Sequence, residues 1–239
     1  MYQLHIANRA TSSWSLRPWL VMRELDIAFQ QIVTPFCETG DSHERFRGFS
    51  PSGRVPCLID SHGEDGGSHD EPMRVWESLS IVEYLAERHP GVWPQDPSRR
   101  AWARSVCAEM HAGFASLRTL CPMHCALRVR LHEVPAPLAA DTARLEALFG
   151  EGLSRFGGPY LCGERFTAAD AFFAPVAFRF ETYGLSLNRP ARDYVDRLLA
   201  LDAMNEWRQA AIAEPWREAE VEAAIRKRAE VIKDFRVDS

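Results

Sequence analysis

The sequence has little that would direct the protein to a membrane or to nucleic acid. No apolar run approaches the roughly 20 residues with which a helix crosses a bilayer. The formal net charge of −5 gives no basic footprint of the kind that binds nucleic acid. The first residues, Met1 to Ala7, contain no basic stretch followed by a long apolar one, which predicts that there is no secretory signal. We therefore expect a cytoplasmic globular protein without membrane or nucleic-acid partners.

The cysteines also lack the spacings that carry redox or metal chemistry. There is no Cys-x-x-Cys pair, and no His/Cys group has zinc spacing. Scattered cysteines in apolar surroundings are typical of reduced structural thiols in a cytosolic protein. The prediction is that the chain holds no metal. The six cysteines are at positions 37, 57, 107, 121, 125 and 162.

The chain is long enough for a substantial core. Its 239 residues are 46% apolar and 26% charged, which is typical of one large domain or two small ones. The first third alternates between the two-residue period of strands and the helical period. Strands are expected at residues 3–8, 29–33, 55–60 and 73–76, and helices at 15–25 and 79–88. Residues 61–72 are rich in Gly, His and acids, which predicts a solvated hairpin tip.

The pattern changes at residues 90–97, where three prolines and a glycine indicate a linker. The sequence beyond it is rich in Ala, Leu, Arg and Glu and has helical spacing throughout. The prediction is an α/β domain at 1–89 and an all-α domain at 98–239. Helices are expected at 98–120, 139–156, 167–180, 192–199 and 219–234.

Val55 and Pro56 stand at the mouth of an apolar strand. Only X-Pro bonds adopt the cis form cheaply, and proline suits the start of a strand because it donates no hydrogen bond. We expect a cis Val55–Pro56 bond that turns the polar backbone atoms of Val55 outward, where an extended peptide can pair with them.

Glu77 and Ser78 stand where a strand gives way to a helix. The first turn of a helix carries unpaired N–H groups and a partial positive charge, and it can hold a carboxylate. Together with Val55, this pair indicates a site for a small, charged peptide.

Residues 11–18 place three serines, Ser12, Ser13 and Ser15, at the junction of the first strand and the first helix. A serine there can cap the helix. It can also donate a hydrogen bond to a bound thiolate, which favours the charged form and lowers the pKa of the thiol. The residues leave open which serine does which.

These motifs together resemble those of the cytosolic glutathione S-transferases, over essentially the whole chain. Residues 12–17, Ser-Ser-Trp-Ser-Leu-Arg, resemble the Ser-Ser-Cys-x-x-Arg signature of the zeta class (maleylacetoacetate isomerase). Val55-Pro56 is similar to the cis-proline of that family, and Glu77-Ser78 to the pair that holds the γ-glutamyl group. Residues 166–170 resemble its capping box. The resemblance implies a thioredoxin-like domain followed by a helical-bundle domain, glutathione as co-substrate, and a homodimer.

The resemblance also implies roles for single residues. The thiol-activating serine falls on Ser12, with Ser13 and Ser15 as competitors. Trp14 stands where the zeta signature has cysteine, which leaves plain stabilisation of the thiolate. Arg17 either holds a carboxylate of glutathione or substrate or, in the interpretation we favour, covers the helix surface.

The second substrate is expected between the two domains, where ligand clefts often form. Met110, His111, Phe114 and Arg118 are spaced three or four apart on the helix expected there. The function predicted is a glutathione transferase that acts on small hydrophobic electrophiles. A glutathione-dependent isomerase, dehalogenase or peroxidase on the same scaffold stays open, as does a non-catalytic glutathione-binding protein. The sequence names neither the electrophile nor the dimer interface.

Overall fold

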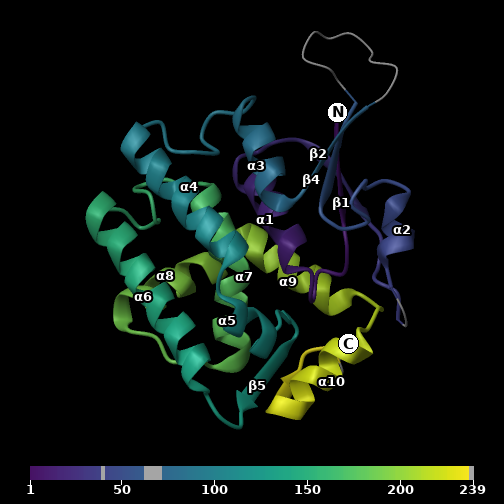
Figure 1. Ribbon diagram of the computed structural model, residues 1–239, viewed down its shortest axis with the longest axis vertical. Helices are drawn as coiled ribbons and strands as arrows, with labels where there is room; N and C mark the ends of the chain where they lie inside the picture. Colours follow the sequence, from purple (N-terminus) through teal and green to yellow (C-terminus); the bar gives the residue numbers. More distant parts are fainter. Residues whose placement is uncertain (39–40, 62–71, 237–239) are drawn as a thin grey trace.

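The computed structural model describes residues 1–38, 41–61 and 72–236 of the chain. Most of the hairpin tip expected at residues 61–72 lies outside them. The first part of the chain folds as an α/β domain (Figure 1). Its elements are β1 (Tyr2–Ile6), α1 (Ser13–Glu24), β2 (Phe29–Val33), α2 (His43–Arg47), β3 (Cys57–Asp60), β4 (Met73–Trp76) and α3 (Ser78–Ala86).

These strands form one four-stranded sheet in the order β2-β1-β3-β4. β1 and β2 are parallel, because α1 makes the crossover between them, whereas β3 runs antiparallel to both β1 and β4. This mixed sheet gives the thioredoxin-like arrangement that the sequence predicted. It brings the end of β1, the start of α1 and the start of β3 to the same end of the sheet.

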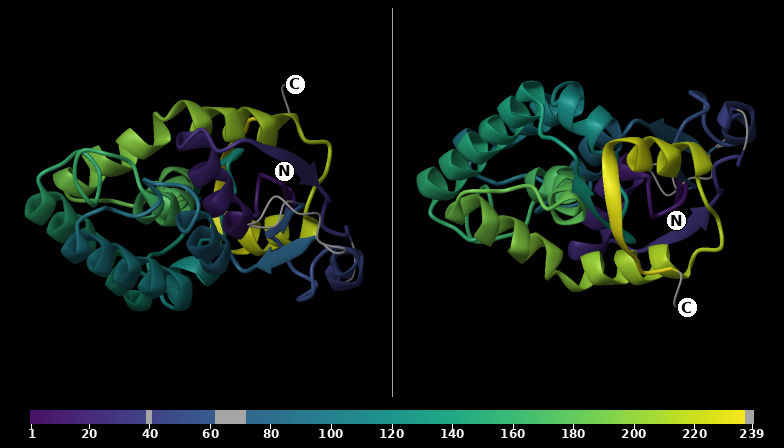
Figure 2. Two further views of the ribbon diagram at one scale, coloured as in Figure 1. Left: turned by 90° about the horizontal axis from the view of Figure 1, so that it is seen from above. Right: turned by 90° about the horizontal axis from the view of Figure 1, so that it is seen from below.

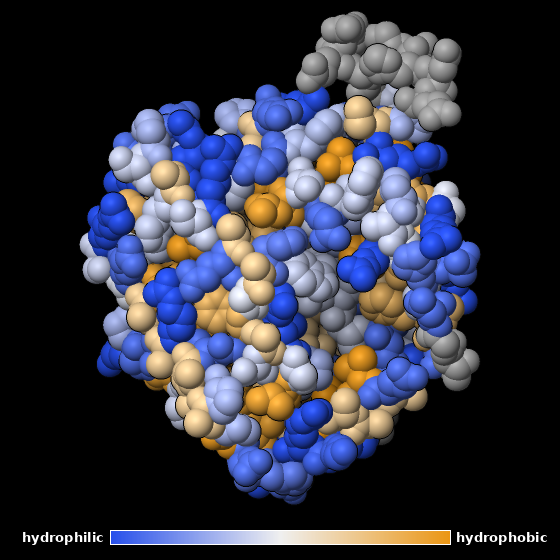
Figure 3. Space-filling view, viewed as in Figure 1, coloured by the Kyte–Doolittle hydropathy of each residue, from blue (hydrophilic) through white to orange (hydrophobic). Residues whose placement is uncertain are grey.

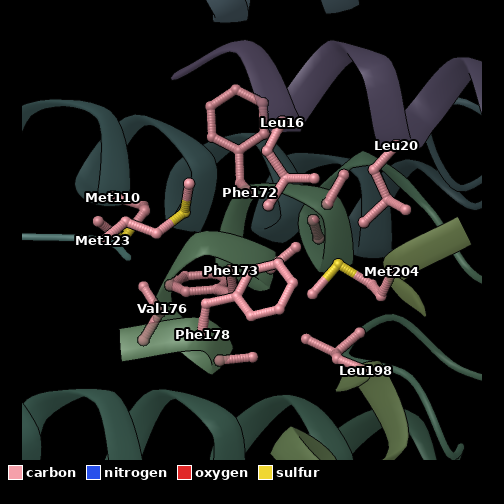
Figure 4. Packing of buried hydrophobic residues seen from close by; sticks show 14 of the residues in the cluster. Leu16, Leu20, Met110, Met123, Phe172, Phe173, Val176, Phe178, Leu198 and Met204 are labelled. Atoms are coloured by element: carbon pink, nitrogen blue, oxygen red, sulfur yellow. The ribbon is translucent and has the colours of Figure 1, made fainter. Parts of the chain in front are cut away.

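The second part of the chain is mainly helical. Its elements are α4 (Pro97–Ala112), α5 (Ala115–Leu120), β5 (Leu127–Leu131), α6 (Ala136–Phe156), α7 (Ala168–Tyr183), α8 (Arg189–Leu199), α9 (Asp202–Ala213), α10 (Ala219–Arg228) and β6 (Ala229–Asp234). α7 is buried along nearly its whole length, and α1 of the first domain packs against it. Leu16 and Leu20 of α1 face Phe172 and its neighbours there (Figure 4). The core therefore runs continuously from one domain into the other.

Two predicted helices are wrong in extent. The helix expected at 98–120 is divided, since α4 ends at Ala112 and α5 begins at Ala115. Phe114 adopts a left-handed conformation with φ of 55°, which no α-helix can continue through. The break allows α5 to turn away from the direction of α4.

The helix expected at 219–234 ends at Arg228, and β6 follows it. β6 pairs antiparallel with β5, a strand that the sequence analysis missed, so the second domain is helical with one two-stranded sheet added. Leu127 and Val129 alternate with arginines along β5, which is the signal that identifies a strand. The sequence before and within β6 is rich in charged residues and Ala, which favours a helix. Its partner strand β5 is about a hundred residues away in the sequence, so no local pattern indicates the pairing.

The capping box expected at 166–170 is confirmed at the start of α7. The carboxylate of Asp170 accepts hydrogen bonds from the N–H of Thr167 at 2.9 Å and the N–H of Leu161 at 3.0 Å. The hydroxyl of Tyr194 donates to it at 3.1 Å. Because Asp170 is fully buried, this carboxylate joins α7, α8 and the loop before α7.

Within the described residues, no helix has the length and apolar character to span a membrane. Seen from below, the last elements of the chain return to the beginning of the N-terminal domain (Figure 2, right). Thr11, just before α1, donates a hydrogen bond to Glu218, the N-cap residue of α10.

Candidate functional site

A pocket of about 480 Å³ opens where β1 ends and α1 begins. Three segments line it: residues 11–14, the region of α2 with Phe36, and residues 53–55 before β3. Three of the predicted site residues, Ser12, Ser13 and Val55, therefore meet in one cavity. The face of the molecule drawn in Figure 3 is chemically mixed, with hydrophobic patches set between hydrophilic residues.

The Val55–Pro56 bond is cis, as the sequence predicted. The ladder between β1 and β3 begins only at Cys57, so Val55 precedes the paired strand and lines the pocket. Its backbone lies just before the β3 ladders begin, so its polar atoms are not used by the sheet pairing and can pair with an extended ligand.

Glu77 and Ser78 join β4 to α3, also as predicted. Glu77 is the N-cap of α3 and has a φ of 69°, which is rare for a residue with a side chain. Such strained conformations cost about 1 kcal/mol or more and cluster at ligand sites. Ser78 is fully buried, and its hydroxyl finds no hydrogen-bond partner among the described residues. The start of α3 therefore combines backbone strain with an unused polar group.

The three serines have different surroundings. Ser12 is almost buried, lines the pocket, and donates a hydrogen bond to the hydroxyl of Ser15 at 2.7 Å. Ser15 is fully buried behind it and accepts from the N–H of Ala7 at 3.5 Å. Ser13 also lines the pocket, and its hydroxyl accepts from Arg179 at 3.4 Å. Ser12 occupies the N-cap position of α1 but makes no capping bond, so the capping interpretation is wrong for this hydroxyl.

Arg17 does not cover the helix surface, so the interpretation that we favoured is wrong. It is 1% exposed, and its guanidinium carbon lies 4.2 Å from the ring centre of Trp14 and 4.8 Å from that of Phe172. Burial, with help from the nearby charge of Arg179, lowers the pKa of Arg17 to about 9. Its Nε and Nη1 atoms make no hydrogen bond to any described residue. Two aromatic rings, one from each domain, hold this cation.

Two further arginines stand close to Arg17. Arg179 is buried and donates to the carbonyl of Cys121 at 2.9 Å, and burial lowers its pKa to about 10. The guanidinium carbon of Arg118 lies 5.4 Å from the ring centre of Trp14. In the part of the chain that the structure describes, none of these three cations is paired with a carboxylate. We call Arg17, Arg118 and Arg179 the arginine cluster.

The four residues expected at the electrophile site divide into two pairs. Met110 is fully buried and Phe114 nearly so, and both belong to the hydrophobic core. The imidazole of His111 contacts Trp14 edge-on, with ring centres 5.1 Å apart, and Arg118 lies over the same ring. Burial and the charge of Arg17 lower the pKa of His111, so its imidazole is neutral at pH 7. Of these four residues, His111 and Arg118 are thus the two that contact Trp14, which lines the pocket.

Sequence reasoning missed Arg179, Thr11 and the residues of α2 at this site. Arg179 belongs to α7, 166 positions after Ser13 in the sequence, and no local pattern connects the two. Trp14 was noted only as a departure from the zeta signature. The structure shows that its ring touches Arg17, Arg118 and His111.

No cysteine is among the described residues that line the pocket. All six are free thiols, and five of them are buried. Burial raises the pKa of the Cys57 thiol to about 11, which makes it a poor nucleophile. Among the described residues, no group of three or more His, Cys, Asp or Glu side chains could hold a metal ion.

Comparison with known proteins agrees with this architecture. Residues 11–88 match the model of the glutathione S-transferase N-terminal domain, and residues 100–210 match that of the C-terminal domain. The fold and the two matched domains define a glutathione transferase. The chain belongs to the glutathione S-transferase family, and it is an enzyme of that family with glutathione as co-substrate.

Similar proteins include isomerases and transferases. Maleylacetoacetate isomerase from Rattus norvegicus is 26% identical over 225 residues, covering 91% of this chain and 94% of the relative. Glutathione S-transferase GstB from Escherichia coli K12 is 28% identical over 180 residues, covering 70% and 78%.

Solved structures share the fold at lower identity. A glutathione transferase homologue from Burkholderia with bound glutathione has a TM-score of 0.59 at 22% identity, covering 89% of this chain and 99% of that one. A tau-class transferase from mango has a TM-score of 0.63 at 18% identity, covering 95% and 96%.

Proposed function

We propose that the chain binds glutathione in the pocket between α1 and β3, and that Ser12 stabilises the glutathione thiolate for attack on an electrophile. The observation that carries this proposal is that Ser12 and Val55 line the same cavity. The backbone of Val55 pairs with the cysteinyl unit of the peptide. This places its sulfur beside residues at the start of α1.

The γ-glutamyl end of glutathione is assigned to the start of α3. The carboxylate of Glu77 meets the α-ammonium group, and Ser78 with the first turn of α3 holds the α-carboxylate. The buried hydroxyl of Ser78, which has no described partner, supports this role. We also propose that domain 1–89 supplies these contacts and domain 98–239 the electrophile site, with 90–97 as linker.

The hydroxyls of Ser12 and Ser15 supply the hydrogen bond to sulfur. In the structure the Ser12 hydroxyl donates to the Ser15 hydroxyl. When a thiolate binds, the Ser12 proton turns to the sulfur, and Ser15 donates to Ser12 in return. The thiol proton leaves to solvent, the sulfur electron pair forms the new bond to carbon, and the leaving group of the electrophile departs with the electron pair of the bond that breaks. A donor aimed at the thiolate lowers the pKa of the thiol from about 8.5.

The binding half of this proposal is tested by Glu77→Gln. The variant removes the charge that faces the α-ammonium group, so the Kd of glutathione should rise about tenfold, because a charge-assisted hydrogen bond is worth about 1.5 kcal/mol or more. Titration calorimetry at neutral pH measures this. Glu87→Gln, at the other end of α3, is the matched control and should bind as the wild type does. No detectable uptake of glutathione by the wild type at millimolar concentration would refute the proposal.

A second candidate function, isomerisation of an anionic substrate, is favoured by the arginine cluster. Three cations without carboxylate partners stand behind Trp14 and Ser13, and buried charge is costly unless it is compensated. Several relatives are named maleylacetoacetate isomerase, and an acetoacetate is a carboxylate. In this reaction the thiolate adds to the substrate and leaves again without net consumption of glutathione.

The arginine cluster predicts a preference that can be measured. Arg118→Gln should lower kcat/KM about tenfold more for an electrophile with a carboxylate than for its neutral methyl ester, because only the anion loses a charge-assisted contact. Steady-state kinetics on the matched pair of substrates test this. Arg130→Gln, on an exposed part of β5, is the control. Equal losses on the two substrates would contradict an anion site.

We further propose that the chain is a cytoplasmic homodimer. The edge strand β4 supports the dimer, because its Met73 and Trp76 side chains are 57% and 41% exposed. Sedimentation of the full chain at a mass of one subunit would reject this assembly.

A further inference from the structure

The segment from Glu214 to Arg236 lies beyond the matched C-terminal domain, which ends at residue 210. We call this segment, which contains α10 and β6, the C-terminal strap. In Figure 1 it is the yellow part at the lower right, and Figure 2 shows it from below, next to the purple start of the chain. The strap therefore returns to the N-terminal domain after the matched part of the helical domain.

Two carboxylates of the strap bind the loop 9–11, which lies between β1 and Ser12. The side chain of Glu214 is 5% exposed, and its carboxylate accepts from the N–H of Arg9 at 2.8 Å and from the Arg9 guanidinium at 2.7 Å. The hydroxyl of Thr11 donates to the carboxylate of Glu218. Both ends of the three-residue loop are thus held by the same strap.

The helical domain holds this loop from a second side. The indole N–H of Trp207, on α9, donates to the carbonyl of Arg9 at 2.9 Å. The N–H of Cys125 donates to the carbonyl of Ala10 at 3.0 Å. Residues 9–11 form a turn with its own hydrogen bond, from the N–H of Thr11 to the carbonyl of Asn8 at 3.3 Å, and these contacts from the second domain hold the turn from outside.

The strap is itself firmly anchored. β6 pairs with β5, and the N–H of Phe235 donates to the carbonyl of Ala126 at 3.0 Å. Within the strap, the carboxylate of Glu222 accepts from Arg217 at 3.1 Å and from Arg236 at 2.9 Å. Because the strap is fixed in this way, its carboxylates hold Arg9 and Thr11 in defined positions.

The loop leads directly into the proposed catalytic hydroxyl. Thr11 lines the pocket beside Ser12, and the N–H of Ser12 donates to the carbonyl of Asn8 at 2.9 Å across the turn. A shift of the loop therefore moves Ser12 relative to the bound sulfur. Hydrogen bonds and reacting groups tolerate little misplacement, and about 1 Å can cost a hundredfold in rate.

We propose that the C-terminal strap is part of the active site, with Glu214 and Glu218 as positioning residues that set the place of Ser12 through Arg9 and Thr11. This inference rests on the proposed function. It assigns the helical domain a second role at the glutathione site, in addition to its contribution to the electrophile site.

The test compares Glu218→Ala with Glu218→Gln, which keeps an acceptor for Thr11. The readout is the pKa of the glutathione thiol bound to the full chain, titrated by the ultraviolet absorbance of the thiolate. Glu218→Ala should raise that pKa by roughly one unit. At pH values below the thiol pKa it should lower kcat/KM about tenfold, while the Kd of glutathione stays within about twofold of the wild type. Glu218→Gln should recover most of the loss. Glu230→Ala, on the exposed face of β6, is the control.

A second route covers the case in which Glu218→Ala does not fold. Thr11→Val removes the same hydrogen bond from the other side, and the double variant should lose no more than either single one. A thiol pKa unchanged from the wild type in Glu218→Ala, or in Thr11→Val where the first does not fold, overturns the proposal. The two hypotheses fail differently. If Ser12→Ala raises the thiol pKa and these variants do not, only the role of the strap is lost. If Ser12→Ala also leaves it unchanged, the proposed function is lost.

Discussion

Ser12→Ala should lower kcat/KM for glutathione conjugation about a hundredfold at pH 6.5. Loss of a single donor to a developing or bound anion costs about 10² to 10³ in rate. Without this donor the pKa of the bound thiol returns toward about 8.5, and most of the bound glutathione stays protonated. Stopped-flow titration of the thiolate absorbance, together with steady-state rates from pH 5.5 to 9, measures both effects.

The neighbouring serines are the controls for this variant. Ser15→Ala should give a smaller loss, because the Ser15 hydroxyl supports Ser12 and lies behind it. Ser13→Ala should change the thiol pKa least, because its hydroxyl is engaged by Arg179. A normal thiol pKa in Ser12→Ala with a raised one in Ser13→Ala would transfer the catalytic role to Ser13.

Asp170→Ala should destabilise the protein by about 4 kcal/mol. The substitution leaves the N–H groups of Leu161 and Thr167 and the hydroxyl of Tyr194 without their acceptor in the interior. Each buried donor that loses its partner costs about 1–3 kcal/mol. Urea denaturation at pH 7, followed by tryptophan fluorescence, gives the free energy of unfolding. Asp170→Asn keeps an acceptor and should lose roughly half as much; a loss below 1 kcal/mol in the Ala variant would contradict the role of Asp170 in folding.

The same residue gives the stability a pH dependence. Burial raises the pKa of Asp170 to about 6, against the hydrogen bonds that favour its ionised form. Between about pH 4 and pH 6 the unfolded chain releases this proton and the folded protein keeps it, so the contribution of Asp170 to stability falls as pH rises, by up to about 3 kcal/mol. Asp170→Asn should lack this part of the pH profile.

The sequence was sufficient for the parts of the fold that short-range patterns encode. The strand at 73–76, the cis bond before Pro56 and the capping box at Asp170 each depend on residues within a few positions of one another. The period of the apolar residues also predicted an α/β domain followed by a helical one. In these places local preference and tertiary packing favour the same structure.

The parts that were missed depend on contacts between distant segments. β6 exists because β5 pairs with it, and the Ala- and Glu-rich sequence of the tail favours a helix by itself. Arg179 and Glu218 contact the start of α1 from the second domain, and no pattern near Ser12 in the sequence predicts these contacts. Met110 has the spacing of a cleft residue, but its side chain is in the core. Periodicity identifies a helix face and does not say what that face meets.

The guanidinium of Arg17 lies between one ring from the first domain, Trp14, and one from the second, Phe172. Severing the chain between α3 and α4 would leave that cation stacked on one side only and would uncover Leu16 and Leu20 as well. Neither half is therefore a sound module for domain exchange with other transferases. Engineering of this protein has to transplant α1 and α7 together.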